Sequence, residues 1–354
     1  MARALSLSRA SLVRDGPSPP KKRPQWIMLG KHADLVSASR RGPHGARVHD
    51  TDLVVFTSDN GDLMIAKDAC PHRGASLARG KVRGACVVCP YHALPVGRDT
   101  WPAHFYSYVR RGPRDNSVVW LDCTSDSSTH PWDPPSFPEH QDPAMRTFAY
   151  TRKFGPEVNP VLMAENMMDY LHLDPVHLVT FVRGAPRVTI VRTGHHGLAE
   201  YAYDSLDGKY DVLVQNEYQL PFTTSLRFVI TERDTGAALP ALLLAFNICP
   251  MGDRGTLLHH QISRPALPRA SPSSPAPKWA RSLADAVVGA VEAVGDLVFM
   301  ATDELPLWED ARIVRNTYPS AWSSNALNGT DEFIAAYRAA MRAEFPGLLE
   351  RYVS

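Results

Sequence analysis

Two short clusters of cysteine and histidine constrain this chain more than any other feature. The first pairs Cys70 with His72, and the second pairs Cys89 with His92, with sixteen residues between the two clusters. Thiolates and imidazoles are ligands of zinc and of iron–sulfur centres. Four such side chains at two short spacings predict that the N-terminal part of the chain folds around a metal centre.

The ligand types favour an iron–sulfur cluster over zinc. In a Rieske [2Fe–2S] centre two histidines replace two cysteines on one iron, which gives the composition of Cys70, His72, Cys89 and His92. Zinc is the alternative, because Cys86 and Cys89 also form a Cys-x-x-Cys pair. Cys-x-His is an uncommon half-site for zinc, and zinc does not explain the proline that follows each of the two cysteines. We therefore expect the [2Fe–2S] cluster, with Cys86 as a small core residue.

Composition narrows the classes of protein. The 354 residues are enough for two domains, and 38 Lys+Arg against 37 Asp+Glu give a formal charge of +1. This balance argues against binding to nucleic acid or to an anionic membrane surface. Five cysteines, three of them crowded together, fit a metal site in a reducing compartment better than a disulfide framework. The longest apolar run, residues 237–249, contains a proline and is too short for a transmembrane segment.

The pattern of predicted elements indicates an α+β protein with two domains. Residues 1–24 are Arg- and Ser-rich with no acid before Asp15, which predicts a disordered leader or a transit peptide. Residues 25–135 carry short strands and an Asn-Gly hairpin turn, typical of a small all-β domain that would hold the cluster. Residues 136–354 are predicted to form a large antiparallel sheet with helices. We expect a cytoplasmic protein, or one imported into a plastid or mitochondrion if the leader is a transit peptide.

A second cluster of polar side chains follows in the larger domain: Asn166, Asp169, His172 and His177. Two histidines and one carboxylate can hold mononuclear Fe(II) and leave coordination positions open. On one continuous helix the two histidines would point about 140° apart. A helix break at Asp174 would allow both to turn inward. Asp169, one turn before His172, can accept the ring N–H of that ligand.

Together these motifs resemble those of the Rieske non-haem iron oxygenases. CPHRGASL and CPYH are similar to the cluster loops of that family, and ENMMDYLHLDPVH is similar to its iron-binding motif. Respiratory Rieske proteins have an extra cysteine in each loop, where this chain has Ala75 and Tyr91. One departure is that the family usually continues His-Gly-Trp, whereas His92 is followed by Ala93 and Leu94 and the next hairpin is shorter.

The resemblance implies the terminal oxygenase of a multicomponent system. A ferredoxin or flavin reductase would bring electrons from NAD(P)H, and the mononuclear Fe(II) would use O2 to hydroxylate, demethylate or desaturate an apolar organic substrate. In the family, electrons cross between subunits through the aspartate that matches Asp169, in the motif that also contains Asn166, which implies a homotrimer. Competing interpretations are a Rieske electron carrier, a zinc-stabilised binding module and an inactive divergent homologue.

The third iron ligand is ambiguous in the sequence. In the family it is a carboxylate on a late helix, in a pattern like Asp-x-x-apolar-apolar-Glu. Anchoring this pattern on Glu309 places Glu304 at the ligand position, on the same helix face as Leu297 and Trp308. Asp303 is one residue away from that position. We therefore expect Glu304, or alternatively Asp303, to bind iron.

Three other residues of this predicted helix affect the assignment. Pro306 can disturb the helix and so change which carboxylate points inward. Asp296 and Asp310 are expected to be solvated surface charges.

Overall fold

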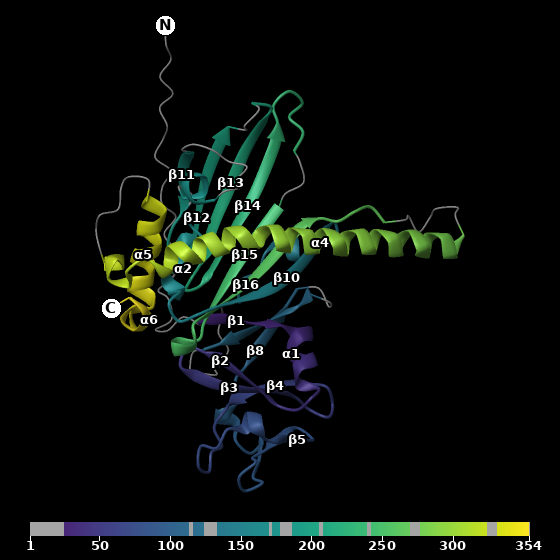
Figure 1. Cartoon of the computed structure of the whole chain (residues 1–354), viewed down its shortest axis with the longest axis vertical. Coiled ribbons are helices and arrows are strands. Elements are labelled where there is room, and N and C mark those ends of the chain that lie inside the picture. The colour runs from purple at the N-terminus through teal and green to yellow at the C-terminus, as the bar shows by residue number, and fades with distance from the viewer. Residues whose placement is uncertain are drawn as a thin grey trace.

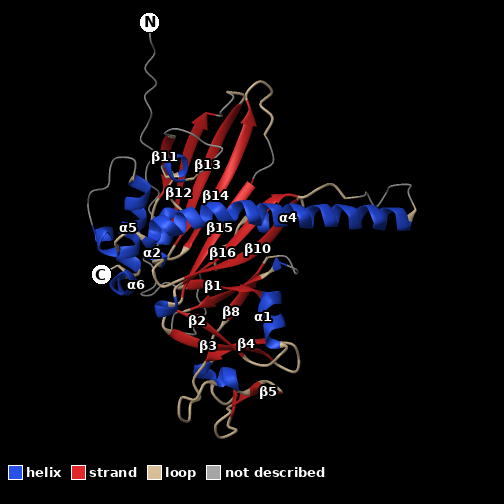
Figure 2. Ribbon diagram, in the orientation of Figure 1, coloured by secondary structure: helices blue, strands red, loops and turns tan. Residues whose placement is uncertain are grey.

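The computed structural model describes residues 25–112, 116–123, 133–169, 172–177, 186–204, 208–238, 242–269, 277–323 and 331–353. The predicted leader, residues 1–24, lies outside these ranges. A small β domain packs against a larger domain that consists of one wide antiparallel sheet and several helices, so the predicted α+β class is confirmed (Figure 1). Figure 2 shows the strands of the wide sheet side by side, with a long helix crossing one of its faces.

The small domain contains three antiparallel sheets of three strands each in the part of the chain that is described. The Asn60-Gly61 turn joins β3 to β4, as predicted, and Gly61 has a φ of 88° that suits glycine. The elements are β1 (Trp26–Lys31), α1 (His32–Ser39), β2 (His44–Val48), β3 (Thr51–Thr57), β4 (Leu63–Lys67), β5 (Lys81–Arg83), β6 (Cys86–Val88), β7 (Pro95–Gly97), β8 (Tyr108–Arg111) and β9 (Val118–Asp122).

The large domain is built on a seven-stranded antiparallel sheet, which confirms the sheet predicted from the sequence. Its strand order is β10-β16-β15-β14-β13-β12-β11, so all neighbours except β10 and β16 follow each other along the chain. The strands are β10 (Met145–Phe154), β11 (Arg187–Arg192), β12 (His196–Asp204), β13 (Tyr210–Gln219), β14 (Thr223–Glu232), β15 (Leu242–Pro250) and β16 (Thr256–Pro265).

The two faces of this sheet have different neighbours. Side chains alternate between the faces, so Tyr150 and Phe246 share one face with His260, which pairs with both. This face is crossed by the long helix. The other face carries His259 and lies against β1 of the small domain. There Gly30, at a bulge with φ 143°, approaches the His259 ring, and an added Cβ would be 3.8 Å from Cε1.

Five named α-helices complete the large domain and position the second polar cluster. Asn159 caps the first helix, because its Oδ1 accepts hydrogen bonds from the next backbone N–H groups at 2.9 and 3.2 Å. This helix ends at Asn166, and a separate short helix begins at Leu173. The helices are α2 (Pro160–Asn166), α3 (Leu173–Val176), α4 (Lys278–Arg315), α5 (Glu332–Glu344) and α6 (Pro346–Tyr352).

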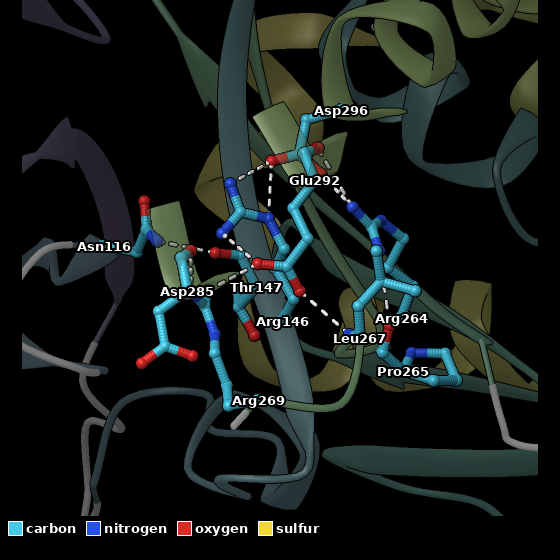
Figure 3. Close-up of polar contacts among 10 residues, drawn as sticks. All are labelled: Asn116, Arg146, Thr147, Arg264, Pro265, Leu267, Arg269, Asp285, Glu292 and Asp296. Carbon is cyan, nitrogen blue, oxygen red and sulfur yellow. Dashed lines mark hydrogen bonds and ion pairs between the residues drawn. The ribbon is translucent and has the colours of Figure 1, made fainter. Parts of the chain in front are cut away.

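A buried ionic cluster fixes α4 across the sheet (Figure 3). Asp296 accepts hydrogen bonds from Arg146 Nε and Arg264 Nη2, both at 2.8 Å. One helical turn earlier, the buried Glu292 accepts from Arg269 Nη2 at 2.7 Å. The prediction that Asp296 is a solvated charge was wrong, since the residue is 7% exposed. It faces the sheet because the arginines of β10 and β16 neutralise it there.

Candidate metal centres

The two cysteine loops of the small domain have the same backbone pattern. In each loop the cysteine N–H donates to the carbonyl five residues later, at 2.8 Å for Cys70 and 2.9 Å for Cys89. The cysteine carbonyl in turn accepts from the N–H four residues later, at 2.8 and 3.0 Å. The two loops therefore present their cysteine and histidine side chains in matching ways.

The four predicted ligand side chains are arranged with sulfur inside and imidazole outside. The thiols of Cys70 and Cys89 are buried, whereas His72 and His92 are exposed with ring centroids 4.8 Å apart. Burial raises the pKa of the Cys89 thiol, but hydrogen bonds from backbone N–H groups and from Cys70 outweigh burial and lower that pKa overall. This donor set fits a Rieske [2Fe–2S] cluster, in which two thiolates hold one iron and two imidazoles hold the other.

The second loop contains a strained residue where the first has glycine. Ala93 has a φ of 55° and Gly74, at the equivalent place, has a φ of 72°. A Cβ in this left-handed region costs roughly 1–2 kcal/mol. We expect Ala93→Gly to raise the free energy of unfolding by about 0.5–1 kcal/mol, because the relieved strain exceeds the entropy that glycine adds to the unfolded chain.

Urea denaturation of the cluster-loaded protein measures this change. Ala85→Gly is the control, since Ala85 is exposed in a neighbouring turn and does not have a positive φ. This control should be slightly destabilised. Equal destabilisation of both variants would show that the conformation at Ala93 carries no strain.

In the large domain, the structure brings three potential ligands together from two places in the chain. His172 precedes α3, His177 follows α3, and Asp310 lies in α4. The Nε2 atoms of His172 and His177 are 3.2 Å apart. Asp310 Oδ1 is 3.2 Å from His172 Nε2 and 3.4 Å from His177 Nε2. The short helix α3 therefore turns both imidazoles toward one point. The predicted break at Asp174 was wrong, because Asp174 and Pro175 lie inside α3 and the helical structure is interrupted before Leu173 instead.

This group of side chains fits a mononuclear iron ion. The three ligand atoms lie within 4.8 Å of one another, and two imidazoles with one carboxylate form the facial triad of non-haem iron sites. Asp310 Oδ1 is buried and has no hydrogen bond of good geometry. Burial lowers the pKa of His172, but the nearby Asp310 carboxylate and its negative charge outweigh burial and raise that pKa. The same negative charge would stabilise a bound cation.

The structure places Glu304 and Asp303 away from the two histidines. Glu304 forms an ion pair with Arg152, and its side chain is 52% exposed. Asp303 accepts a hydrogen bond from the Tyr150 hydroxyl and lies 2.8 Å from His260 Nδ1. Neither carboxylate belongs to the ligand group among the described residues, so the structure corrects the expected third ligand to Asp310.

The third ligand was predicted incorrectly because the wrong face of α4 was expected to be buried. The prediction placed the buried face of α4 at Leu297 and Trp308, but these side chains are 61% and 56% exposed. The buried stripe instead passes through Leu307, Asp310 and Val314, which are spaced by three and four residues. Asp310 is only 4% exposed, so the prediction of a solvated surface charge was wrong. A carboxylate on an apolar stripe was the sequence signal for this ligand.

One further carboxylate orients a histidine, and a second lies near the other histidine. Glu309 Oε2 is 3.0 Å from His177 Nδ1, so the ring can donate this N–H to Glu309 and keep the Nε2 lone pair for a metal. In the sequence, Glu309 served only to align the family's ligand pattern, and its contact with His177 was not predicted. Asp169 Oδ2 lies 3.8 Å from His172 Nδ1, beyond hydrogen-bond distance, so the predicted hydrogen bond between them is not formed.

Removing the Glu309 carboxylate should weaken binding of the mononuclear iron. We expect Glu309→Ala to lower iron affinity by about 10- to 100-fold, because His177 loses the partner that fixes its tautomer and ring orientation. Competition with a chelator, followed by iron analysis, measures the change. Glu304→Ala is the control on the same helix, and it should retain iron. If both variants behave like the wild type, Glu309 does not support the site.

A surface cavity of about 210 Å³ opens beside the iron site. It is lined by Asn166 and Asp169, the two predicted motif residues, and by Asp331 at the start of α5. Asn166 Nδ2 is buried in this region without a hydrogen-bond partner. The predicted motif residues therefore face the outside of the molecule next to His172.

Comparisons with known proteins agree with these two donor sets. Residues 25–98 match the family model for the Rieske [2Fe-2S] domain. The oxygenase component of 3-ketosteroid-9-alpha-monooxygenase from Mycobacterium tuberculosis is 28% identical over 200 residues, 52% of this chain and 51% of that protein. The oxygenase component of dicamba O-demethylase from Stenotrophomonas maltophilia is 30% identical over 149 residues, 38% of this chain and 42% of that protein. The matches thus span about half of these relatives or less.

The fold is shared over nearly the full length of a solved structure. The crystal structure of dicamba monooxygenase bound to dicamba has a TM-score of 0.66 to this protein. The alignment covers 92% of this chain and 96% of that chain at 18% identity, which establishes a common fold. With its Rieske domain, its sequence similarity and its shared architecture, the chain is a homologue of the oxygenase components of Rieske non-haem iron oxygenases.

Proposed function

We propose that this chain is the terminal oxygenase of a Rieske system and oxidises a small apolar organic substrate. One observation carries the proposal: a single chain holds both the Cys70/His72/Cys89/His92 donor set and the His172/His177/Asp310 group. When loaded, the cluster would supply single electrons from an external NAD(P)H-linked ferredoxin or reductase, and the mononuclear iron would supply O2 activation.

The protein residues would hold the iron and shape the space around it. The two histidines and Asp310 would hold the ion and leave coordination positions open for O2 and substrate. Glu309 would keep His177 in the tautomer that binds metal. The sheet face beneath α4 contributes apolar side chains on β14 and β15, including Phe228 and Phe246, which support an apolar substrate.

Asp169 is the proposed entry point for electrons from a neighbouring subunit. It lines the surface cavity beside His172, and its carboxylate remains 39% exposed. The exposed imidazoles of His72 and His92 lie on loops of the small domain, whereas α2 lies in the other domain; Figure 1 shows β5 of the small domain at the lower end of the molecule, away from α2. In the proposed homotrimer, the cluster loops of one copy would dock at the cavity beside Asp169 of the next copy, so that each cluster serves the neighbouring iron.

Replacement of Asp169 by asparagine should separate electron transfer from metal binding. We expect Asp169→Asn to keep both metal sites filled but to lower substrate-coupled O2 uptake by about 100-fold or more, because the charged link to His172 is lost. Iron analysis and an oxygen electrode give the two readings. Unchanged O2 uptake would contradict the proposed electron path. Asp331→Asn in the same cavity is the control, and it should retain most of the activity.

The function itself is tested by metal content and turnover. The proposal expects about three irons per chain, a reduced Rieske EPR signal, and oxidation of a compound from a panel of aromatic, steroid and porphyrin-derived substrates with a surrogate reductase. Two irons per chain would instead indicate an electron carrier. Three irons without O2 uptake on any substrate would indicate an inactive homologue.

The cellular location stays a prediction. No helix in the described part of the chain is long and apolar enough to cross a membrane. We propose a cytoplasmic enzyme, or an organellar one if residues 1–24 direct import, and the location of a fluorescent fusion with and without these residues tests both.

A further inference from the structure

The outward face of α4 carries a continuous apolar seam that the proposed function does not use. Four of its members, Val287, Val291, Val294 and Val298, are 55–60% exposed. Its member Trp308 and two apolar side chains beside it, Leu283 and Leu297, are also exposed. The α4 seam consists of Ala280, Ala284, Val287, Val291, Val294, Val298, Ala301, Leu305 and Trp308.

The spacing within the α4 seam is that of a coiled coil. Its members alternate by four and three residues without interruption over four heptads. A straight helix would drift by about 20° per heptad against this repeat, so the repeat suits a partner helix that supercoils with α4. A face that merely tolerated solvent would have no reason to keep this period.

The α4 seam points away from the body of its own protein. The opposite side of the helix carries Glu292, Asp296, Asp303 and Asp310, all engaged with the sheet or the iron site. In Figure 1, α4 passes in front of the sheet, no element is drawn over it, and its N-terminal half extends beyond the sheet edge. A partner helix can therefore lie along the seam without meeting the rest of the chain.

We propose that a second copy of this chain occupies the α4 seam in an antiparallel helix pair. The seam is small at its N-terminal end, with Ala280 and Ala284, and large at its C-terminal end, with Leu305 and Trp308. In an antiparallel pair with Val291 opposite the partner's Val294, Ala280 faces the partner's Leu305, Ala284 faces the partner's Ala301, and Trp308 lies at the N-terminal end of the partner helix. A parallel pair would instead place the bulky Trp308 against its own copy and Ala280 against the partner's Ala280.

Charge and symmetry support the same arrangement. An antiparallel pair brings the basic end of α4, with Lys278 and Arg281, to the level of the partner's Glu304. A two-fold contact of this kind uses the same surface on both copies and forms a closed pair that does not extend into a filament. The rest of each chain lies on the outer side of the helix pair. A membrane surface fits less well, because interfacial helices carry Lys and Arg on the polar face, whereas the opposite face of α4 is acidic.

Sedimentation of the metal-loaded full chain tests this contact. The double variant Val291→Glu/Val294→Glu places a charge in the central layers, and we expect it to raise the dissociation constant of the pair by about 100-fold or more. The mass of the assembly should halve, from six chains to three if the proposed trimer forms, or from two chains to one if it does not. The result therefore does not depend on the proposed trimer or on activity.

A control variant and the metal content distinguish loss of the helix pair from loss of folding. Glutamate is a better helix former than valine, so both substitutions preserve α4. Iron content and the visible spectrum should equal those of the wild type. Ala286→Glu is the control, because this exposed α4 residue lies off the seam, and its assembly mass should be unchanged. Equal masses for the wild type and the double variant would overturn the proposal. So would seam-dependent binding of the wild type to phosphatidylglycerol vesicles without self-association.

Discussion

Asp310→Asn is expected to remove the mononuclear iron and to leave the [2Fe–2S] cluster in place. Iron content should fall from about three to about two per chain, and O2 uptake should fall to background. Asp310 is the one carboxylate that meets both His172 and His177 in the described residues, at 3.2 and 3.4 Å. An amide has no charge to balance the ion, and an imidazole pair alone binds iron weakly.

Two neighbours on the same helix are the controls for this result. Asp303→Asn and Glu304→Gln should each retain three irons, because Asp303 is bonded to Tyr150 and Glu304 is paired with Arg152. The visible absorption of the cluster should be unchanged in all three variants. If Asp310→Asn keeps its full iron content and either control loses iron, the third ligand is Asp303 or Glu304, as the sequence suggested.

Arg338→Met is expected to destabilise the large domain by about 3–5 kcal/mol. Arg338 donates from Nε and Nη2 to the two carboxylate oxygens of Glu165, at 2.7 and 2.8 Å, and both side chains are largely buried. The pair joins α5 to α2 and lies one residue before Asn166 of the iron motif. Without the guanidinium, Glu165 would be a buried carboxylate with no bidentate partner.

The cost of this substitution should depend on pH with a definite sign. Burial raises the pKa of Glu165 in the folded state, and the hydrogen bonds and charge of Arg338 oppose this rise. In Arg338→Met the folded pKa therefore rises further above the unfolded value. The folded variant then binds a proton that the unfolded chain has lost, so its stability falls as pH increases through this window.

Urea denaturation at pH 5 and pH 8 measures both effects. The deficit of Arg338→Met relative to the wild type should be larger at pH 8. The double variant Glu165→Met/Arg338→Met is the control, because it removes both charges, and it should lose less stability than the single variant. A deficit below about 1 kcal/mol that is equal at both pH values would contradict the role of this pair.

The parts of the molecule that the sequence predicted are those whose information is local. The hairpin of β3 and β4 follows from alternation around an Asn-Gly turn, and the antiparallel sheet follows from successive β-rich segments separated by turns. The cysteine and histidine loops are equally local, since each pair lies within four residues. The boundary between the domains, the cluster ligands and the trimer remain predictions.

The third iron ligand could not be predicted from local sequence, because α4 carries two stripes of residues that each repeat every seven positions. One stripe is acidic and buried, through Asp296, Asp303 and Asp310, and the other is apolar and exposed, through valines such as Val291 and Val298. The usual expectation that apolar residues are buried and charged residues are exposed therefore predicts the wrong face of α4 as the buried one. Only the arginines, Tyr150, His260 and the two histidines that face α4 make burial of the acids favourable.

The sequence by itself predicted two metal centres and left one iron ligand open. The spacings of Cys70, His72, Cys89 and His92, and of His172 and His177, are short enough to survive in any fold that keeps their loops. Tertiary structure alone decided that Asp310 completes the iron site and that Glu309 orients His177. The physical reason is that the rotation of a helix about its axis is set by the partners it meets across the sheet. Those partners are distant in the sequence, from 32 residues for Arg264 and Asp296 to 153 for Tyr150 and Asp303.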